Sequence, residues 1–269
     1  MRSIHIQHNY FEVANGGLFL RAWAIIGALL LVLTASAQPG MYRLMGRGAA
    51  TNSYIFVDSA SARPTANNED TVKSPARDYT NATILFAQVA DYPTPANTPG
   101  VLTDNKGNTY TLVMSPTINN LRVRYYMCFN PVLTGGGVIL TYSSTVTIYP
   151  VIFVQAYRGV TTLPTYATNS ATSTLSISSI STNSVTTTVA NSLVVSTVAT
   201  QATITTAPTV SGSVTISERM NWFPLTGSRN VFAASYNSIK SGTATFSVTH
   251  TTSGVNFNQQ TVAAIAAFQ

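Results

Sequence analysis

An acidic, amide-rich segment, DNKGNTYTLV (104–113), is the first place in the sequence where side chains could do chemistry. Its oxygens suit a calcium loop, in which ligands at alternate positions precede a glycine and a distant glutamate. Lys106 stands where the second ligand should be, and no glutamate follows at the required distance. The asparagines and Gly107 instead tolerate positive φ, as hairpin turns require. The segment therefore predicts a turn, and the alternative is a surface cation on Asp104.

The other side chains with reactive chemistry are few and isolated. Beyond residue 37 the sole histidine is His250, so the sequence offers no histidine cluster for zinc and no choice of general base. Cys128 has no near neighbour that would lower its pKa, which indicates a half-buried, inert thiol. TGGGV (134–138) precedes a strand and not a helix, which indicates a tight connection instead of a phosphate-binding loop. We predict no catalytic residue, no metal site and no cofactor.

Paired carboxylates are a further route to catalysis, because glycosidases use two of them across one cleft. The strand-rich part of the chain carries three acidic residues, each beside a turn: Asp91, Asp104 and Glu218. Since any two of them can meet in space, a glycosidase-type enzyme is the third functional hypothesis.

The aromatic segment ERMNWFPLTGSRN (218–230) supplies a binding hypothesis. Trp222 is expected in a loop between two strands, with Asn221, Arg219 and Arg229 close in sequence. An exposed indole beside amide and guanidinium groups can stack on, and hydrogen-bond to, a sugar ring or a protein partner. The competing interpretation is that Trp222 folds down over an open end of the protein.

The elements that must position these residues are predicted to be strands. Apolar runs of strand length recur with turn signals between them, and no window before the last shows a convincing helical period. The runs are 82–90, 109–114, 121–130, 138–149, 151–157, 192–200, 212–218, 229–237, 243–250 and 260–268. Strands without helices for parallel crossovers indicate an all-β fold, an antiparallel two-sheet β-sandwich that is jelly-roll or immunoglobulin-like.

Alternation assigns the faces of these strands. In LRVRYYMCFN (121–130), Leu121 and every second residue form a core face, and the face with Arg122, Arg124 and Cys128 lies opposite it. The runs 151–157 and 260–268 are apolar on both faces, as expected for central strands that are covered twice. The Thr- and Ser-rich stretch 161–188 fits a loop with outer strands better than a glycosylated linker.

The beginning of the chain indicates export. The apolar run 22–34 is too short for a membrane span of about 20 residues and is followed by ASA (35–37), a small-x-small cleavage pattern. Residues 1–37 are therefore predicted to be a signal peptide, with retention as a hydrophobic segment as the alternative. Residues 38–76 are predicted to be an irregular arm, and residues 77–269 a single β-sandwich domain.

Charge is scarce. Charged residues make up 8% of the chain, and the basic ones that give a net charge of +6 are scattered singly. Nothing resembles the basic run or basic helix that follows a phosphate backbone, so we predict no nucleic-acid partner. Uncharged Thr/Ser strands also leave sheet edges open to pairing, which favours assembly.

The order of the motifs resembles a pattern in exported, largely uncharacterised bacterial and phage-associated β-sandwich proteins. The resemblance lies in DNKGNTYTLV, RVRYYMCFNPV, YPVIFVQAYRGV, NSLVVST and the closing TVAAIAAF, and it covers roughly Ala82 to Gln269. These motifs are turns and core strands, so the resemblance implies a fold and an exterior location and carries over no catalytic residue.

Three functions follow as hypotheses. The first is a non-catalytic structural or adhesive module at the cell surface, in an extracellular filament or in a phage virion, which associates with itself or with other surface or virion proteins. The second is a glycan-binding module that uses the segment around Trp222. The third is the glycosidase-type enzyme. No stable membrane span is expected after processing.

Overall fold

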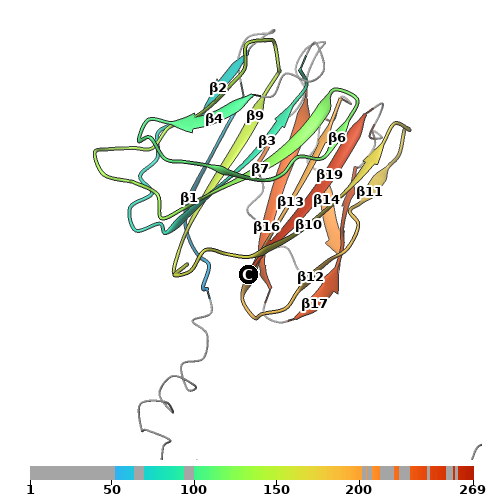
Figure 1. The fold of residues 1–269 in the computed structure, drawn as a ribbon. Coiled ribbons are helices and arrows are strands. Elements are labelled where there is room, and N and C mark those ends of the chain that lie inside the picture. The colour runs from blue at the N-terminus through green and yellow to red at the C-terminus, as the bar shows by residue number, and fades with distance from the viewer. Residues whose placement is uncertain are drawn as a thin grey trace, which may run out of the picture. The chain divides into compact units, whose positions relative to one another are not determined.

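The computed structural model describes residues 52–63, 70–93, 100–201, 204, 208–212, 221–223, 231–240, 243–252, 257 and 260–269, and of 221–223 and 237–240 it describes the backbone alone. Residues 50–269 form one compact unit. Every regular element in the described ranges is a strand, and every strand pair is antiparallel, which confirms the predicted all-β class (Figure 1).

Two large sheets form the body of this unit. The first has the order β1 (Ile55–Ala62), β9 (Val151–Arg158), β3 (Ile84–Asp91), β7 (Leu121–Phe129) and β5 (Thr111–Met114), with β6 (Thr117–Ile118) also paired to β7. The second has the order β10 (Tyr166–Ser173), β19 (Thr261–Phe268), β13 (Ser192–Thr200), β16 (Phe232–Lys240) and β15 (Asn221–Phe223).

Three small sheets complete the structure. One consists of β2 (Thr71–Lys73), β8 (Leu140–Ser143) and β4 (Val101–Asp104). The second consists of β11 (Ser179–Ser181), β18 (Val248–Thr251) and β14 (Thr209–Gly212), and the third pairs β12 (Val185–Thr187) with β17 (Ala244–Phe246). In Figure 1 the β2–β4 side lies at the left and the β11, β12 and β17 side at the right of the two large sheets.

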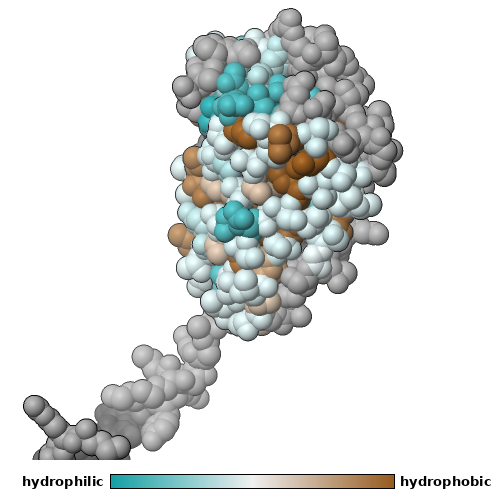
Figure 2. Space-filling view, turned by 90° about the vertical axis from the view of Figure 1, so that its right-hand side faces the viewer, coloured by the Kyte–Doolittle hydropathy of each residue, from teal (hydrophilic) through white to brown (hydrophobic). Residues whose placement is uncertain are grey.

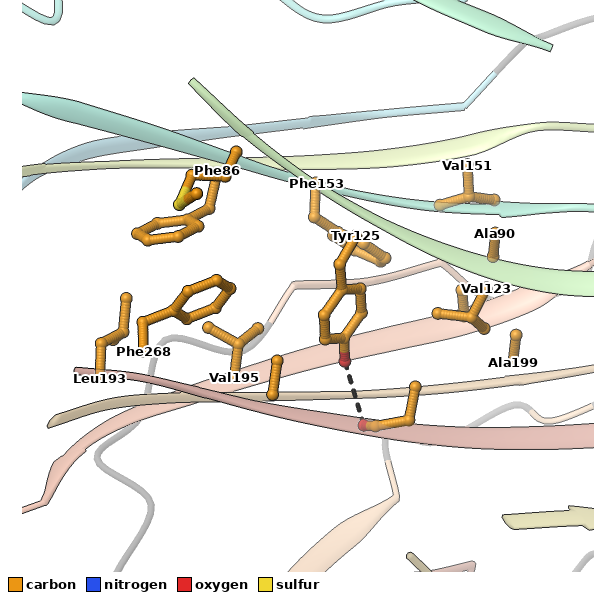
Figure 3. Close-up of a cluster of buried hydrophobic side chains, with 14 of the residues drawn as sticks. Phe86, Ala90, Val123, Tyr125, Val151, Phe153, Leu193, Val195, Ala199 and Phe268 are labelled. Carbon is orange, nitrogen blue, oxygen red and sulfur yellow. Dashed lines mark hydrogen bonds between the residues drawn. The ribbon is translucent and has the colours of Figure 1, made fainter. Parts of the chain in front are cut away.

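The main hydrophobic core lies between the two large sheets, and both contribute alternate residues to it (Figure 3). The ring centroids of Phe86 and Phe268 lie 4.3 Å apart across this interface. The Tyr125 hydroxyl donates a hydrogen bond to the Ala264 carbonyl oxygen at 3.0 Å, so the buried phenol keeps a partner in the opposite sheet. The predicted core face of β7 is confirmed, because Leu121, Val123, Tyr125 and Met127 belong to this core.

Each large sheet also buries its outer face. Outward-facing residues of β3, β7 and β9 pack against the β2–β8–β4 sheet, and those of β13, β16 and β19 pack against the small sheets on the other side. The prediction that 151–157 and 260–268 are covered twice is therefore confirmed by β9 and β19, which are buried on both faces. A sandwich of two layers was expected, but the small sheets add a further layer outside each large sheet.

The face of β7 opposite the main core is therefore buried, not half-open. Arg122 and Arg124 are 6% and 7% exposed, and Cys128 is 3% exposed. Both arginines have acceptors there, because Arg122 donates to Asp91 of β3 and Arg124 donates to the Gly100 carbonyl oxygen.

The strand order of the first half of the unit recurs in the second. The large sheets read β1-β9-β3-β7-β5 and β10-β19-β13-β16-β15, and two of the small sheets read β2-β8-β4 and β11-β18-β14. In each case the first strand of the half pairs with the last, and the second with the last but one. Residues 52–158 and 166–269 thus form two halves of matching topology that pack through their large sheets.

The sandwich begins earlier than predicted. Residues 55–62 form the edge strand β1, which pairs with β9 from Ile55–Arg158 to Ala62–Ile152. They were expected in an irregular arm over 38–76 whose single strand candidate was 54–57, so the start of β1 agrees with that candidate and the rest of the strand was not predicted. Thr71–Lys73 likewise pair with β8. After Val57 the strand β1 is polar and half-buried, so that part lacks the apolar run by which the other strands were recognised. The interpretation of 161–188 as loop with outer strands is confirmed by β10, β11 and β12.

A clasp of side chains ties both ends of the described body together. The Asn52 amide oxygen accepts hydrogen bonds from the backbone N–H groups of Thr161 and Thr162, both at 3.1 Å. Its amide nitrogen donates to the Gln269 carbonyl oxygen at 3.3 Å, and the Gln269 side chain accepts from Thr188 N–H at 2.7 Å. This clasp of Asn52, Thr161–Thr162 and Gln269 joins the first half, the connection between the halves and the last strand.

Candidate functional site

The predicted binding segment has a different backbone from the one expected. Asn221–Phe223 form the short strand β15, in which Trp222 lies opposite Ala234 of β16, so these residues are not in a loop. The side chains of Asn221 and Trp222, and all of Arg219 and Arg229, lie outside the described part of the chain. The Trp222 hypothesis stays a prediction, and a glycan panel comparing the protein with its Trp222→Ala variant tests it.

The segment that begins at Asp104 is a turn, as predicted, but it is not a hairpin. It carries the chain from β4, in the small sheet, to β5, in the large sheet. One carboxylate oxygen of Asp104 accepts from the N–H groups of Lys106 and Asn108, and the other accepts from the Asn108 amide at 2.7 Å and the Tyr110 hydroxyl at 2.8 Å. Gly107 takes the positive φ (76°) that the turn requires.

The two glycine-containing loops interlock. Asn105 receives a hydrogen bond from Ile139 N–H at 2.9 Å, and Asn108 receives one from Val132 N–H at 2.6 Å. The Lys106 ammonium donates to the Gly135 carbonyl oxygen at 2.6 Å. The amides that looked like metal ligands therefore hold the chain before β8 in place. Both oxygens of Asp104 are engaged in the same way, which leaves the surface-cation interpretation without a free ligand atom on this carboxylate.

Ser196 and His250 resemble a catalytic dyad but are built into the core. The Ser196 oxygen lies 2.8 Å from His250 Nε2 and 3.1 Å from the Ala264 carbonyl oxygen. Because the single hydroxyl hydrogen goes to that carbonyl, His250 must donate from Nε2, which is the opposite of activating a serine nucleophile. Both residues are buried, and burial lowers the pKa of His250 to about 3. The pair therefore serves packing of β13 against β18.

Cys128, Asp91 and Asp104 also have structural roles. Burial, together with a smaller effect of the nearby Asp104, raises the pKa of the Cys128 thiol to about 11, so the thiol is protonated at neutral pH. Asp91 is fully buried, and Glu218 lies outside the described residues. In the described ranges no three His, Cys, Asp or Glu side chains gather as a metal site would require.

A buried polar cluster surrounds Asp91, at the end of β3. Register places Asp91 directly opposite Arg122 of β7. The guanidinium donates to both carboxylate oxygens, from Nε at 2.9 Å and from Nη2 at 3.0 Å, and the Tyr142 hydroxyl of β8 donates at 2.6 Å. This bidentate ion pair with a third donor joins the large sheet to the small one above it.

Arg124, two residues along β7, carries the second guanidinium of the cluster. It makes two long hydrogen bonds, from Nη1 to the Gly100 carbonyl oxygen at 3.3 Å and to the Tyr126 hydroxyl at 3.4 Å. Its Nε is buried and has no hydrogen-bond partner in the structure. Gly100 is required beside it, because a Cβ there would lie 2.4 Å from the Tyr142 ring. Burial lowers the pKa of Arg124, but Tyr142, Tyr126 and Asp91 outweigh this effect and raise it, so the group is charged.

A pocket of about 190 Å³ opens onto this cluster. Its polar lining consists of Arg122, Arg124, Asn119, Asn120, Ser115 and Thr117. The last four come from β6 and the turns on either side of it, and Asn119 adopts a positive φ of 51° in the β6–β7 turn. The arrangement can hold a small anion among hydrogen-bonding groups.

This pocket was not predicted, because the arginine face of β7 was described from the sequence only as the face opposite the core. A signal was present, because two arginines at alternate positions of an otherwise apolar strand imply buried or paired charges. The partner Asp91 was identified as an acid beside a turn, but pairing to Arg122 depends on strand register, which the sequence does not give.

Comparisons with protein-family models, curated proteins and solved structures find no match to the chain. Among the described residues no helix has the length and apolar character needed to cross a membrane. The function is therefore argued from the architecture and the surface.

Proposed function

We propose that the chain is a non-catalytic structural or adhesive module of an exterior assembly, such as a cell surface, an extracellular filament or a phage virion. It acts by associating with copies of itself or with other surface proteins. The observation that carries this proposal is the repeated strand order, in which two halves pack through their large sheets into one body.

Each half has the strand order of a jelly roll, with one complete four-strand sheet and part of a second. In the first half these are β1-β9-β3-β7 and β2-β8-β4, and in the second β10-β19-β13-β16 and β11-β18-β14. Jelly rolls are common in viral capsid and lectin domains. This support is an analogy at the level of the fold, which does not by itself fix a function.

The outer surface fits a module that makes contacts through many weak, uncharged groups. On the exposed small sheets, hydroxyls pair across strands, with Ser181 2.6 Å from Thr249 and Thr186 2.8 Å from Thr245. Figure 2, which views the β11 side of the body, shows mainly residues of intermediate hydropathy with apolar residues gathered among them. Apolar side chains on such a surface supply contact area with little charge to desolvate.

The edge of β10 is less open to strand pairing than its uncharged sequence suggests. The N–H group of Ser170 donates to the Asn169 side chain at 2.9 Å, and its carbonyl oxygen accepts from the Asn183 amide at 2.8 Å. The centre of this edge is thereby closed to a neighbouring strand. We infer that contacts between copies use exposed apolar loop residues such as Leu175 and Val132, which are 69% and 54% exposed.

The test is the mass of the native assembly together with the location of the protein. We expect light scattering to give a multiple of the chain mass, and fractionation to place the protein outside the cell or in virions. Leu175→Glu and Val132→Glu should reduce the assembly without unfolding it, whereas Thr186→Glu, an equal charge on an exposed hydroxyl strand, should not. A monomer with its native partners present, or turnover of a substrate, would contradict the proposal.

A further inference from the structure

The pocket beside Arg124 is lined by two arginines and by uncharged polar residues, which is a suitable composition for binding an anion. Asp91 makes its bidentate ion pair with Arg122, so among the described residues the cluster holds two guanidinium groups and one carboxylate, and Arg124 has no carboxylate partner of its own. Arg124 is 7% exposed, and its Nε has no partner in the structure. A buried guanidinium with two long hydrogen bonds is unfavourable unless another acceptor meets it.

Size and lining restrict the ligand. A volume of about 190 Å³ is below the roughly 300 to 1,000 Å³ of pockets for drug-sized molecules, and it corresponds to a single sugar ring or a small acid. Two guanidinium groups with one carboxylate match a monovalent carboxylate ligand better than phosphate, whose charge at pH 7 is about −1.5 to −2. Two amides, Asn119 and Asn120, and two hydroxyls, Ser115 and Thr117, supply donors and acceptors for neighbouring hydroxyl groups.

We propose that this pocket binds the carboxylate of a sugar acid, such as a uronate residue of an acidic glycan, with Arg124 as its charged contact. Arg122 lies beside it as the second guanidinium of the wall, held in place by Asp91 and Tyr142. The amide and hydroxyl groups at the mouth hydrogen-bond to the ring hydroxyls. The site lies within one chain and is independent of the assembly proposed above.

The experiment is a titration of the full-length protein, followed by calorimetry or by chemical shifts, with sodium D-glucuronate as the probe. D-Glucose tests the need for the carboxylate, acetate the need for the sugar hydroxyls, and inorganic phosphate the preference for one negative charge. We expect saturable binding of glucuronate, weaker binding of acetate and phosphate, and none of glucose. Absence of saturation by about 50 mM, equal binding of glucose, or tighter binding of phosphate would overturn the proposal.

Two variants connect the binding to the pocket. Arg124→Gln should weaken glucuronate binding about tenfold or more, since a charge-assisted contact is lost. Arg158→Gln, which makes the same change at an exposed arginine of β9, should leave it unchanged. Asn119→Asp keeps a residue type that accepts positive φ and adds a repelling charge at the mouth, so it should weaken binding even if Arg124→Gln folds poorly. Unchanged binding in Asn119→Asp would place the ligand elsewhere.

Discussion

The imidazole of His250 lies between the Ser196 hydroxyl and the ring of Tyr236, whose centroid is 5.3 Å away, and it has no solvent contact. Its Nδ1 has no hydrogen-bond partner in the structure. A neutral imidazole tolerates this position because one N–H is satisfied, but an imidazolium would bring a second, unsatisfied N–H and a charge into the core. The residue is thus compatible with folding in one protonation state.

Acid should therefore destabilise the protein through His250. Its pKa falls from 6.5 in the unfolded chain to about 3 in the fold, so below pH 6.5 the unfolded state binds a proton that the folded state excludes. From pH 7 to pH 5 the free energy of unfolding should fall by about 2 kcal/mol from this group. Urea denaturation at both pH values, compared with a His250→Gln variant that lacks this loss, measures the effect. Equal pH dependence in the two proteins would contradict it.

Asp104 is the acceptor on which the interlocked loops depend. Burial alone would raise its pKa, but hydrogen bonds from Asn108, Tyr110 and Lys106 outweigh this and lower it. Its stabilising effect is therefore present above the unfolded pKa of 3.8 and is lost as pH falls through the lower folded pKa.

Asp104→Asn should cost about 2 to 3 kcal/mol at neutral pH, because the amide is a weaker acceptor and brings donors toward groups that already donate. Thermal unfolding measures the loss. The matched control is Asp78→Asn, at an exposed turn where the carboxylate accepts from Thr80 N–H at 2.9 Å, and a much smaller change is expected there. Similar losses of stability in both variants would show that the loop contacts of Asp104 stabilise the protein no more than those of an exposed turn.

At the scale of elements, the apolar strands could be predicted with approximate bounds, and the polar ones only in part, since outer strands were expected within 161–188 without bounds. β3, β7, β9, β13 and β19 were recognised because they are buried on both faces and read as unbroken apolar or alternating runs. β1 and β10 contain Ser, Thr, Asn and Asp, and their structure is imposed by pairing with β9 and β19. The sequences of these edge strands therefore do not by themselves predict a strand, because β-propensity depends on the neighbouring strand.

The strand β1 provides a test of this dependence. A chain that starts at Ala50 retains the compact unit and should unfold like the full-length protein. Starting at residue 64 removes β1, with buried Tyr54 and Ala60, and uncovers the edge of β9. We expect the unfolding midpoint to fall by about 10 °C or more, or the protein to aggregate. Equal midpoints for the two truncated chains would restore the interpretation of this region as an arm.

At the scale of the molecule, the two halves share their largest core. Residues of both large sheets interleave there, with Phe86 from the first half against Phe268 from the second (Figure 3). The all-β class and the double coverage of β9 and β19 followed from composition and pattern. The repeated topology could not be predicted in this way. The two halves match in strand order, and strand order cannot be derived from the local sequence of each strand.

A shared core implies that the halves unfold together. Phe86→Ala should cost about 3 to 5 kcal/mol and lower one common transition, with the calorimetric and van't Hoff enthalpies equal in both proteins. Leu163→Ala, at a side chain that is 63% exposed, is the control and should change stability by less than about 0.5 kcal/mol. Two separated transitions, with one insensitive to Phe86→Ala, would show that each half is stable alone.

The clasp at Asn52 and the pocket beside Arg124 lie at opposite ends of β7. The clasp lies near the Phe129 end of β7. Phe129 pairs with Ile84, and Ile84 pairs on its other side with Tyr157. The connection that Asn52 binds follows shortly after Tyr157. Arg122 and the pocket lie at the other end of the same strand, seven residues and about 23 Å away. Asn52 and Gln269 are therefore neighbours at one end of β7, and a molecule bound in the pocket would sit at the opposite end of that strand.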